Sequence, residues 1–374
     1  MRKILLLLFI VGFFAQNALA KTQKVRIAIF DTLVWEKLAT EKYEQNYKKG
    51  LDLAASELST KGYSLEFKYF EYDKKPLAII KEVKKVKAWD PHFIVGPRFS
   101  SLFLLLEKHF DNTLVISPLA TANGVSKMPK NFWSVSPPNK DSVSALAIVA
   151  NRYFPKKPVH PIIEVDCKYC VDFGRQFAAA AKEMAVPLTP SGSKYLGDTA
   201  EKVDISKLIP KKNENVIYLL PNRSFTSGTL MGRISNHLKR HDIVFLGADG
   251  WGDWSAGYTG KYKTIYKYQG FRVTPWSLDK NDEETIEFHK KYESKFSEKA
   301  TGNISMISYK TILAVFDSLP NANAKVSSQL ILGSFQKATK RNPNYGRPSS
   351  FGVYELDQNG EKFKGLVNVN KDAS

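Results

Sequence analysis

Short apolar runs alternate with longer segments of helical period along most of this chain. Residues 25–30 and 93–95 are apolar runs bounded by turn residues, whereas residues 43–58 place apolar side chains on one helical face. A strand buried on both faces reads as a continuous apolar run, and the helix that connects it to the next strand shows one apolar stripe. The alternation therefore predicts an α/β fold with mostly parallel sheets.

The length of the chain predicts two lobes. Its 374 residues exceed what one hydrophobic core usually serves. The same alternation resumes after Pro137 and Pro138, where we expect the chain to change lobe. We expect the first lobe to comprise residues 21–138 and 273–347, and the second lobe to comprise residues 139–272 and 348–374.

The first twenty residues have the pattern of a secretory signal. Arg2 and Lys3 precede an apolar run over residues 4–14, and residues 18–20 (ALA) form a cleavage site of the A-x-A type. The run is short for a membrane-spanning helix, and no cysteine follows the cleavage site to carry a lipid. We expect a mature chain that begins at Lys21 and resides in the periplasm without a lipid anchor.

A formal net charge of +18 accompanies this export signal. The lysines are spread along the chain rather than gathered beside stacking aromatic residues, and export separates the protein from nucleic acids. We therefore expect no nucleic-acid partner. The charge indicates a general attraction to anionic surfaces of the envelope.

The two cysteines of the chain, Cys167 and Cys170, form a C-x-x-C pair. In an oxidising compartment such a pair closes into a local disulfide, or it remains as two free thiols, and both alternatives stay open. The sequence shows no βαβ thioredoxin pattern around them and no second pair of metal ligands. We expect neither a metal nor a cofactor.

The sequence lacks the local motifs of common enzyme classes. It contains no G-x-S-x-G elbow, no P-loop, no H-E-x-x-H motif and no G-x-G-x-x-G after the first strand. His237 and His241 are four residues apart around two basic residues, which indicates a basic helix end rather than a metal site. We expect a binding protein rather than an enzyme.

The ends of the predicted strands carry a resemblance to a known family. In an open α/β sheet the ligand crevice lies at the carboxyl ends of the strands. At these positions the chain resembles the type I periplasmic binding proteins of the branched-chain amino-acid type, in an order that spans nearly all of the mature chain. The matching segments are 95–101 (VGPRFSS), 116–122 (ISPLATA), 132–137 (FWSVSP), 172–174 (DFG), 245–251 (FLGADGW) and 351–353 (FGV).

The resemblance implies a fold and a function. The fold would be two Rossmann-like lobes joined by a hinge of three crossovers. A small molecule would be trapped between the lobes when the hinge closes, and the protein, acting as a monomer, would deliver it to a membrane ABC permease.

The strand ends also indicate a site for an amino-acid-like ligand. The hydroxyls of Ser100 and Thr121, beside backbone N–H groups, suit a carboxylate, and helix capping is the alternative for both. Asp249 matches the position where the family places an acid against the ligand ammonium, and a plain turn residue is the alternative. The other residues placed around the ligand are Leu119, Ala120, Phe173, Trp251, Trp35, Tyr43 and Phe225.

Two arginines depart from the pattern expected for an apolar amino acid. Arg98 and Arg223 stand in loops near the expected cleft. There a guanidinium recognises a carboxylate or phosphate, or else the two residues are surface cations. The sequence thus leaves the ligand open among amino acids and similar small polar metabolites. An envelope protein of the same fold that regulates a protein partner is the alternative function.

Overall fold

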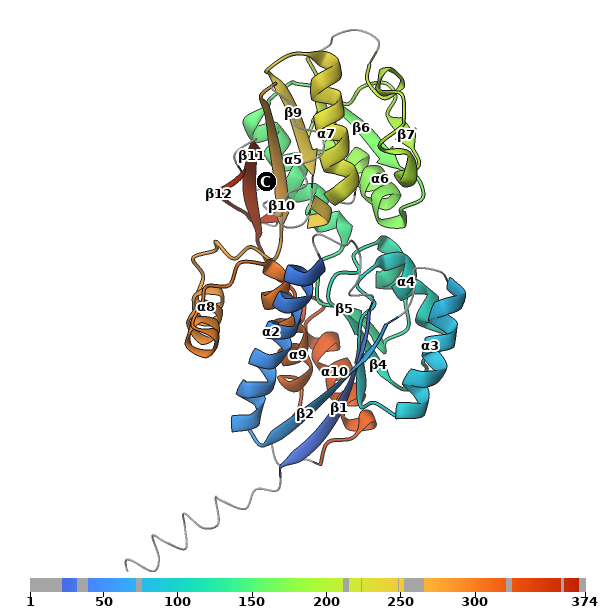
Figure 1. Cartoon of the computed structure of the whole chain (residues 1–374), viewed down its shortest axis with the longest axis vertical. Helices are drawn as coiled ribbons and strands as arrows, with labels where there is room; N and C mark the ends of the chain where they lie inside the picture. Colours follow the sequence, from blue (N-terminus) through green and yellow to red (C-terminus); the bar gives the residue numbers. More distant parts are fainter. Residues whose placement is uncertain are drawn as a thin grey trace, which may run out of the picture.

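The computed structural model describes residues 22–31, 40–71, 76–210, 215–222, 224–247, 249–251, 266–320, 325–357 and 360–369. Within them, two α/β lobes are stacked one above the other (Figure 1). The predicted signal segment, residues 1–20, lies outside the described residues. Among the helices that are described, none is long and apolar enough to cross a membrane.

The first sheet has parallel strands in the order β2-β1-β3-β4-β5. Successive side chains of a strand point to opposite faces. In β1, Ile27 and Ile29 therefore join one core with α2, whereas Ala28 and Phe30 join another with α3 and α4. The elements are β1 (Gln23–Phe30), α2 (Thr40–Thr60), β2 (Tyr63–Phe70), α3 (Pro76–Trp89), β3 (Phe93–Val95), α4 (Ser100–Leu105), β4 (Leu114–Ser117) and β5 (Phe132–Ser134).

The second sheet has the order β12-β11-β10-β9-β8-β6-β7. Phe173 and Phe177 of α6 pack on one face, and Leu230 and Ile234 of α7 pack on the other. The last two strands, β11 and β12, form an antiparallel hairpin. The elements are α5 (Asn139–Tyr153), β6 (Val159–Glu164), α6 (Lys168–Glu183), β7 (Ser193–Tyr195), β8 (Ile217–Leu219), α7 (Ser224–Leu238), β9 (Ile243–Gly247), β10 (Tyr268–Thr274), β11 (Phe351–Asp357) and β12 (Gly360–Val367).

The chain passes between the lobes after β5, after β10 and after the last helix, α10 (Ser328–Arg341). The helices α8 (Glu283–Phe296), α9 (Asn303–Phe316) and α10 follow β10 in sequence but lie with the first lobe (Figure 1). The two-lobed α/β fold with three crossovers is therefore confirmed. The boundary expected between residues 272 and 273 falls inside β10, which pairs with β11 as far as Thr274.

The helices α2 and α9 approach each other closely at Gly50. A Cβ atom on Gly50 would lie 2.0 Å from Oγ of Ser308 and 2.1 Å from the carbonyl oxygen of Ser305. The hydroxyl of Ser308 donates a hydrogen bond of 2.9 Å to the carbonyl oxygen of Tyr47. The missing side chain of Gly50 thus lets the returning chain dock against the first helix of its lobe.

Candidate functional site

The loop after β4 is held by the hydroxyl of Ser117. This hydroxyl donates to the carbonyl oxygen of Pro97 at 2.6 Å and accepts the backbone N–H groups of Ala120 at 3.0 Å and Leu119 at 3.4 Å. A hydroxyl has one donor and two acceptor positions. All hydrogen-bonding positions of the Ser117 hydroxyl are therefore occupied within the protein. The N–H groups of Leu119 and Ala120 also have their partner in this hydroxyl.

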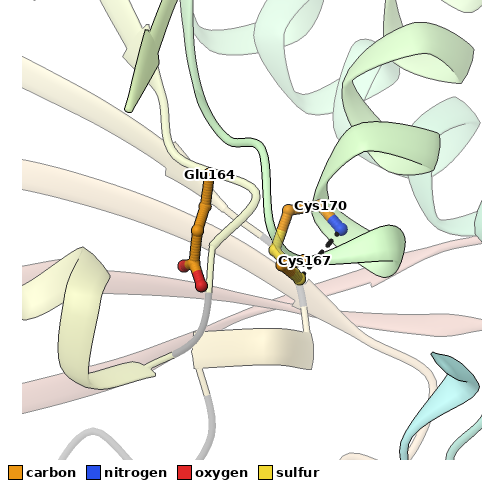
Figure 2. Close-up of side chains that lie close together, drawn as sticks. All are labelled: Glu164, Cys167 and Cys170. Atoms are coloured by element: carbon orange, nitrogen blue, oxygen red, sulfur yellow. Dashed lines mark hydrogen bonds between the residues drawn. A yellow bond between two sulfur atoms is a disulfide. The ribbon is translucent and has the colours of Figure 1, made fainter. Parts of the chain in front are cut away.

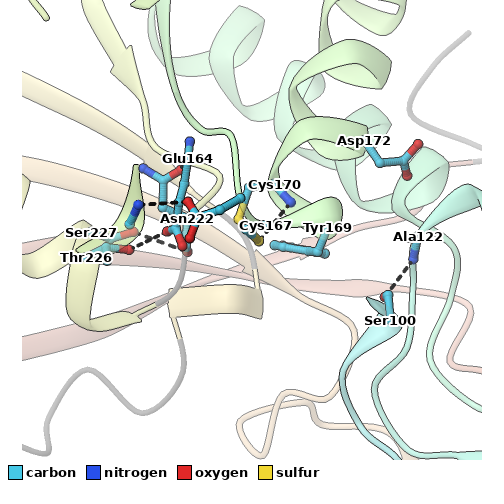
Figure 3. The surroundings of a disulfide bond; sticks show 12 residues. Ser100, Ala122, Glu164, Cys167, Tyr169, Cys170, Asp172, Asn222, Thr226 and Ser227 are labelled. Carbon is cyan, nitrogen blue, oxygen red and sulfur yellow. Dashed lines mark hydrogen bonds between the residues drawn. A yellow bond between two sulfur atoms is a disulfide. The ribbon is translucent and has the colours of Figure 1, made fainter. Parts of the chain in front are cut away.

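Ser100, at the start of α4, also holds this loop, but its O–H donor has no acceptor among the described residues. Its Oγ accepts the backbone N–H groups of Thr121 and Ala122, each at 3.1 Å (Figure 3). Both acceptor positions are then occupied, and the described residues offer no acceptor for its O–H group. The capping residue of α4 is Phe99, so Ser100 fixes the loop rather than capping its helix.

Thr121 lies directly beside this hydroxyl. Its side chain is buried, and its Oγ1 atom has no hydrogen-bond partner among the described residues. A buried hydroxyl without a partner costs about 1–3 kcal/mol. Ser100 and Thr121 together therefore present two unused O–H donors beyond the carboxyl ends of β3 and β4, which fits the predicted contact with a carboxylate.

Arg98 is buried in the first lobe, so the prediction of a surface cation is wrong. Its guanidinium lies 4.5 Å from the ring centre of Tyr43 and 5.0 Å from that of Phe99, and its Nε is 3.6 Å from Oδ1 of buried Asp31. Burial alone would lower the pKa of Arg98, but Tyr43 and Asp31 raise it above its usual value. The arginine is thus a permanent, compensated cation at the carboxyl end of β1.

Sequence reasoning missed Asp31 and Tyr47 in this cluster. Asp31 directly follows β1, so the rule that ligand sites lie at strand ends would have selected it. Tyr47 is fully buried, and burial and the charge of Asp31 raise the pKa of its hydroxyl well above 10. Its hydroxyl oxygen has no hydrogen-bond partner in the described part of the chain.

On the second lobe, Asp249 follows β9 at the start of a short 3-10 turn, η5 (Asp249–Trp251). It is partly exposed, and its Oδ1 accepts a hydrogen bond of 2.8 Å from the hydroxyl of Tyr169 on α6. The carboxylate therefore lies at the carboxyl end of its strand, where the sequence predicts it, and contacts a second strand-end segment.

Two aromatic residues expected around the ligand belong to the core instead. Trp251 is fully buried, donates from Nε1 to the carbonyl oxygen of Leu220 at 2.7 Å, and covers Gly247. Phe173 is also fully buried, among the apolar side chains of α5 and β10. The prediction that they wall the cleft is wrong for both, because the turn and the helix direct these rings inward.

Three further predictions fall on residues whose relevant atoms are not described. Trp35 and Arg223 lie outside the described residues, as does the side chain of Phe225.

Leu119 and Ala120 lie in the loop held by Ser117, with Ala120 buried and Leu119 partly exposed.

The lobes are bridged by Asp172 on α6. Its Oδ2 accepts the backbone N–H of Asn123 from the first lobe at 2.9 Å and the side-chain amide of Asn139 at 2.9 Å. A cavity of about 470 Å³ lies beside this bridge, lined from the first lobe by residues that include Ala122 and Lys127 and from the second by residues that include Lys168 and Arg175. A crevice with three cations and one carboxylate suits a polar or acidic small molecule.

A second polar cluster lies at the ends of β6 and β8. Glu164 is fully buried and accepts a hydrogen bond of 2.8 Å from the hydroxyl of Thr226, while Asn222 accepts its backbone N–H at 3.2 Å. Cys167 and Cys170 form a disulfide beside it (Figure 2). Glu164 and the two sulfurs have potential metal-ligand atoms within 4.8 Å of one another, but sulfurs bonded to each other are not thiolate ligands.

Solved structures share this architecture. The leucine-binding protein LivK of Thermotoga maritima superposes with a TM-score of 0.73 at 15% identity, over 92% of this chain and 99% of that chain. LivJ of Streptococcus pneumoniae, solved with isoleucine, has a TM-score of 0.71 at 15% identity over 92% and 99% of the two chains. The fold is that of the type I periplasmic binding proteins. The predicted resemblance is thus confirmed at the level of the fold.

Another type I binding protein widens the range of ligands found on this fold. A solute-binding protein of R. palustris, solved with 4-hydroxybenzoate, has a TM-score of 0.71 at 12% identity over 92% of this chain and 96% of that chain. No family model matches the present chain, and no curated protein matches it in sequence. At these identities the similarity to type I binding proteins establishes the fold alone. The ligand site must be inferred from the residues of this chain.

Proposed function

We propose that this protein is an exported solute-binding protein that captures a small carboxylate-bearing metabolite, of amino-acid type, between its lobes and passes it to a membrane ABC permease. The observation that carries the proposal is the pair of unused hydroxyl donors on Ser100 and Thr121. They lie at strand ends of the first lobe, where ligands bind in open α/β sheets.

The proposed site favours a ligand that carries both a negatively charged carboxylate and a positively charged ammonium group. A carboxylate would accept from the two hydroxyls, and an ammonium would face Asp249 on the other lobe. Isoleucine and 4-hydroxybenzoate, found on two solved proteins of this fold, share a carboxylate. Export from the cytoplasm is supported by the signal pattern of residues 1–20.

A ligand screen tests the proposal. The protein lacking residues 1–20, freed of carried-over ligand, is screened by thermal shift against amino acids, aromatic acids, dicarboxylates, sugars and nucleosides, because a ligand bound by the folded state raises the melting temperature. We expect a shift with carboxylate-bearing compounds. A flat screen with folded protein would refute the proposal and favour an envelope protein that acts on a protein partner.

Matched variants then locate the site. Thr121→Val removes the unused hydroxyl while keeping the shape, and we expect calorimetry to show a loss of affinity of about 10-fold to 100-fold. Thr311→Val is the control, because its buried hydroxyl bonds the carbonyl oxygen of Ile307 within α9. Equal affinities for the two variants would remove Thr121 from the site.

A further inference from the structure

The disulfide Cys167–Cys170 lies in a βαβ unit, which the sequence did not reveal. The strand β6 ends at Glu164, Cys167 is the N-terminal capping residue of α6, and α6 leads to β7, which pairs in parallel with β6. The expectation excluded a thioredoxin pattern, and this βαβ unit belongs to the seven-stranded sheet of the second lobe. The pair begins a helix of 16 residues at the carboxyl edge of a parallel sheet.

The two sulfur atoms differ in access and in surroundings. Cys170 is fully buried, whereas Cys167 is partly exposed and precedes the exposed residue Lys168. The backbone N–H of Cys170 donates to Sγ of Cys167 at 3.2 Å. A helix N-terminus and an N–H donor stabilise a thiolate, so Cys167 has the surroundings of a reactive cysteine and Cys170 those of a buried partner.

A buried carboxyl group completes the cluster. Glu164 offers an oxygen within 4.8 Å of both sulfurs (Figure 2). The hydroxyls of Thr226 at 2.8 Å and Tyr195 at 3.5 Å donate to Oε2 of the same carboxyl group. A local disulfide that only fastened the loop would not need a buried acid beside it, whereas disulfide exchange at a buried sulfur needs a group that supplies its proton.

We propose that Cys167 and Cys170 form a thiol–disulfide exchange site that is reduced by a protein dithiol. A thiolate of the donor attacks Sγ of Cys167. The bond between the two sulfurs breaks, and its electron pair goes to Sγ of Cys170, which takes a proton from the carboxyl group of Glu164. Glu164 regains a proton from the solvent. The second thiol of the donor gives its proton to the solvent and attacks the donor sulfur of the mixed disulfide, which releases Cys167 as a thiolate.

The reaction balances. The Cys167–Cys170 pair gains two electrons and the donor dithiol becomes a disulfide. The donor releases two protons to the solvent, and the solvent returns one to Glu164, which replaces the proton given to Cys170. The site is separate from the hydroxyl pair of Ser100 and Thr121, so the proposal does not depend on the identity of the ligand.

Single-cysteine variants test which sulfur reacts. Cys170→Ser and Cys167→Ser of the exported protein are incubated with oxidised glutathione, and the mixed disulfide is followed by intact mass. Because access and thiolate character favour Cys167, we expect Cys170→Ser to react at least about 10-fold faster than Cys167→Ser. Equal rates, or no reaction of either variant while circular dichroism shows both folded, would overturn the proposal.

The role of Glu164 is tested on the intact disulfide. Reduction of the wild type by dithiothreitol should proceed without loss of the folded circular dichroism signal. Glu164→Gln should slow it by about 10-fold and flatten its pH profile, since the acid is lost. Glu183→Gln is the control, because it removes an exposed carboxyl group at the other end of α6. The charged and titratable groups around Glu164 include Tyr195 and the nearby Asp166.

Two results would contradict this role. If the disulfide opens only when denaturant unfolds the protein, it is a structural cross-link. If Glu164→Gln and Glu183→Gln change the rate and its pH profile equally, Glu164 does not carry the proton.

Discussion

The hydroxyl of Tyr169, which stands between the two cysteines in sequence, donates a hydrogen bond of 2.8 Å to Oδ1 of Asp249. It joins the start of α6 to the turn after β9 and holds the one carboxylate that the sequence predicts for a ligand ammonium. In the proposed site, an ammonium group of the ligand would meet this carboxylate.

Asp249→Asn should lower the affinity of the protein for ligands that carry an amine. The amide keeps an oxygen for Tyr169 but loses the charge, so we expect calorimetry to show a loss of about 10-fold or more for an amino acid and little change for its deaminated analogue. Tyr169→Phe, which keeps the charge, should lose less. An equal loss for the amine-bearing and amine-free ligands would exclude an ionic role for Asp249.

Asp172→Ala should shift the protein toward an open form. The substitution removes the acceptor that joins Asn123 of the first lobe to α6, and the loss of a contact between the lobes favours their separation. We expect small-angle X-ray scattering to show a larger radius of gyration without ligand. The control is Asp204→Ala, since among the described residues the Asp204 carboxylate accepts hydrogen bonds from the nearby Ser206 alone. An unchanged radius would show that the bridge does not hold the lobes together.

Gly247→Ala should destabilise the second lobe. The added Cβ would lie 1.8 Å from Cε2 of buried Trp251, and the packed ring has no space to withdraw. We expect chemical denaturation to show a loss of about 1–3 kcal/mol. Gly333→Ala is the opposite case, because a Cβ atom on this residue of α10 meets open space. Alanine favours a helix more than glycine does, so the free energy of unfolding should rise by about 0.5–1 kcal/mol. A neutral result at Gly247 would mean that Trp251 is free to move.

The free energy of unfolding should fall in acid because Glu57 becomes protonated. Partial burial raises the pKa of Glu57, but hydrogen bonds from Tyr309, Lys291 and Lys61 outweigh it and lower the pKa from 4.5 to about 2. The folded state therefore holds the charged form more strongly than the unfolded state does. The stabilisation is fully present above about pH 4.5 and is lost as the pH falls toward 2.

The contribution of Glu57, about 2 kcal/mol after allowance for solvent screening, is measured by urea denaturation across this pH range. Glu57→Gln should lower stability at neutral pH and flatten its decline in acid. Glu82→Gln, which removes an exposed ion pair with Lys85 on α3, should leave the decline unchanged. An identical decline in both variants would contradict the assignment.

Hydrophobic periodicity predicted the α/β class, and the length of the chain predicted two lobes. The α/β class depends on the spacing of apolar residues within single elements, such as Ile27 and Ile29 in β1, and that spacing is local in the chain. The predicted strand ends indicated Ser100 and Thr121, and the resemblance to type I periplasmic binding proteins indicated Asp249.

Only the tertiary structure decided how side chains distant in sequence meet. Trp251 and Phe173 turned inward because the neighbouring sheets offered apolar contacts, and Arg98 was buried because Asp31 lay beside it. Glu164, Thr226 and the disulfide come together from two strand ends separated by some sixty residues. Sequence patterns fix which elements form, whereas burial and pairing at a site depend on which elements fold against one another.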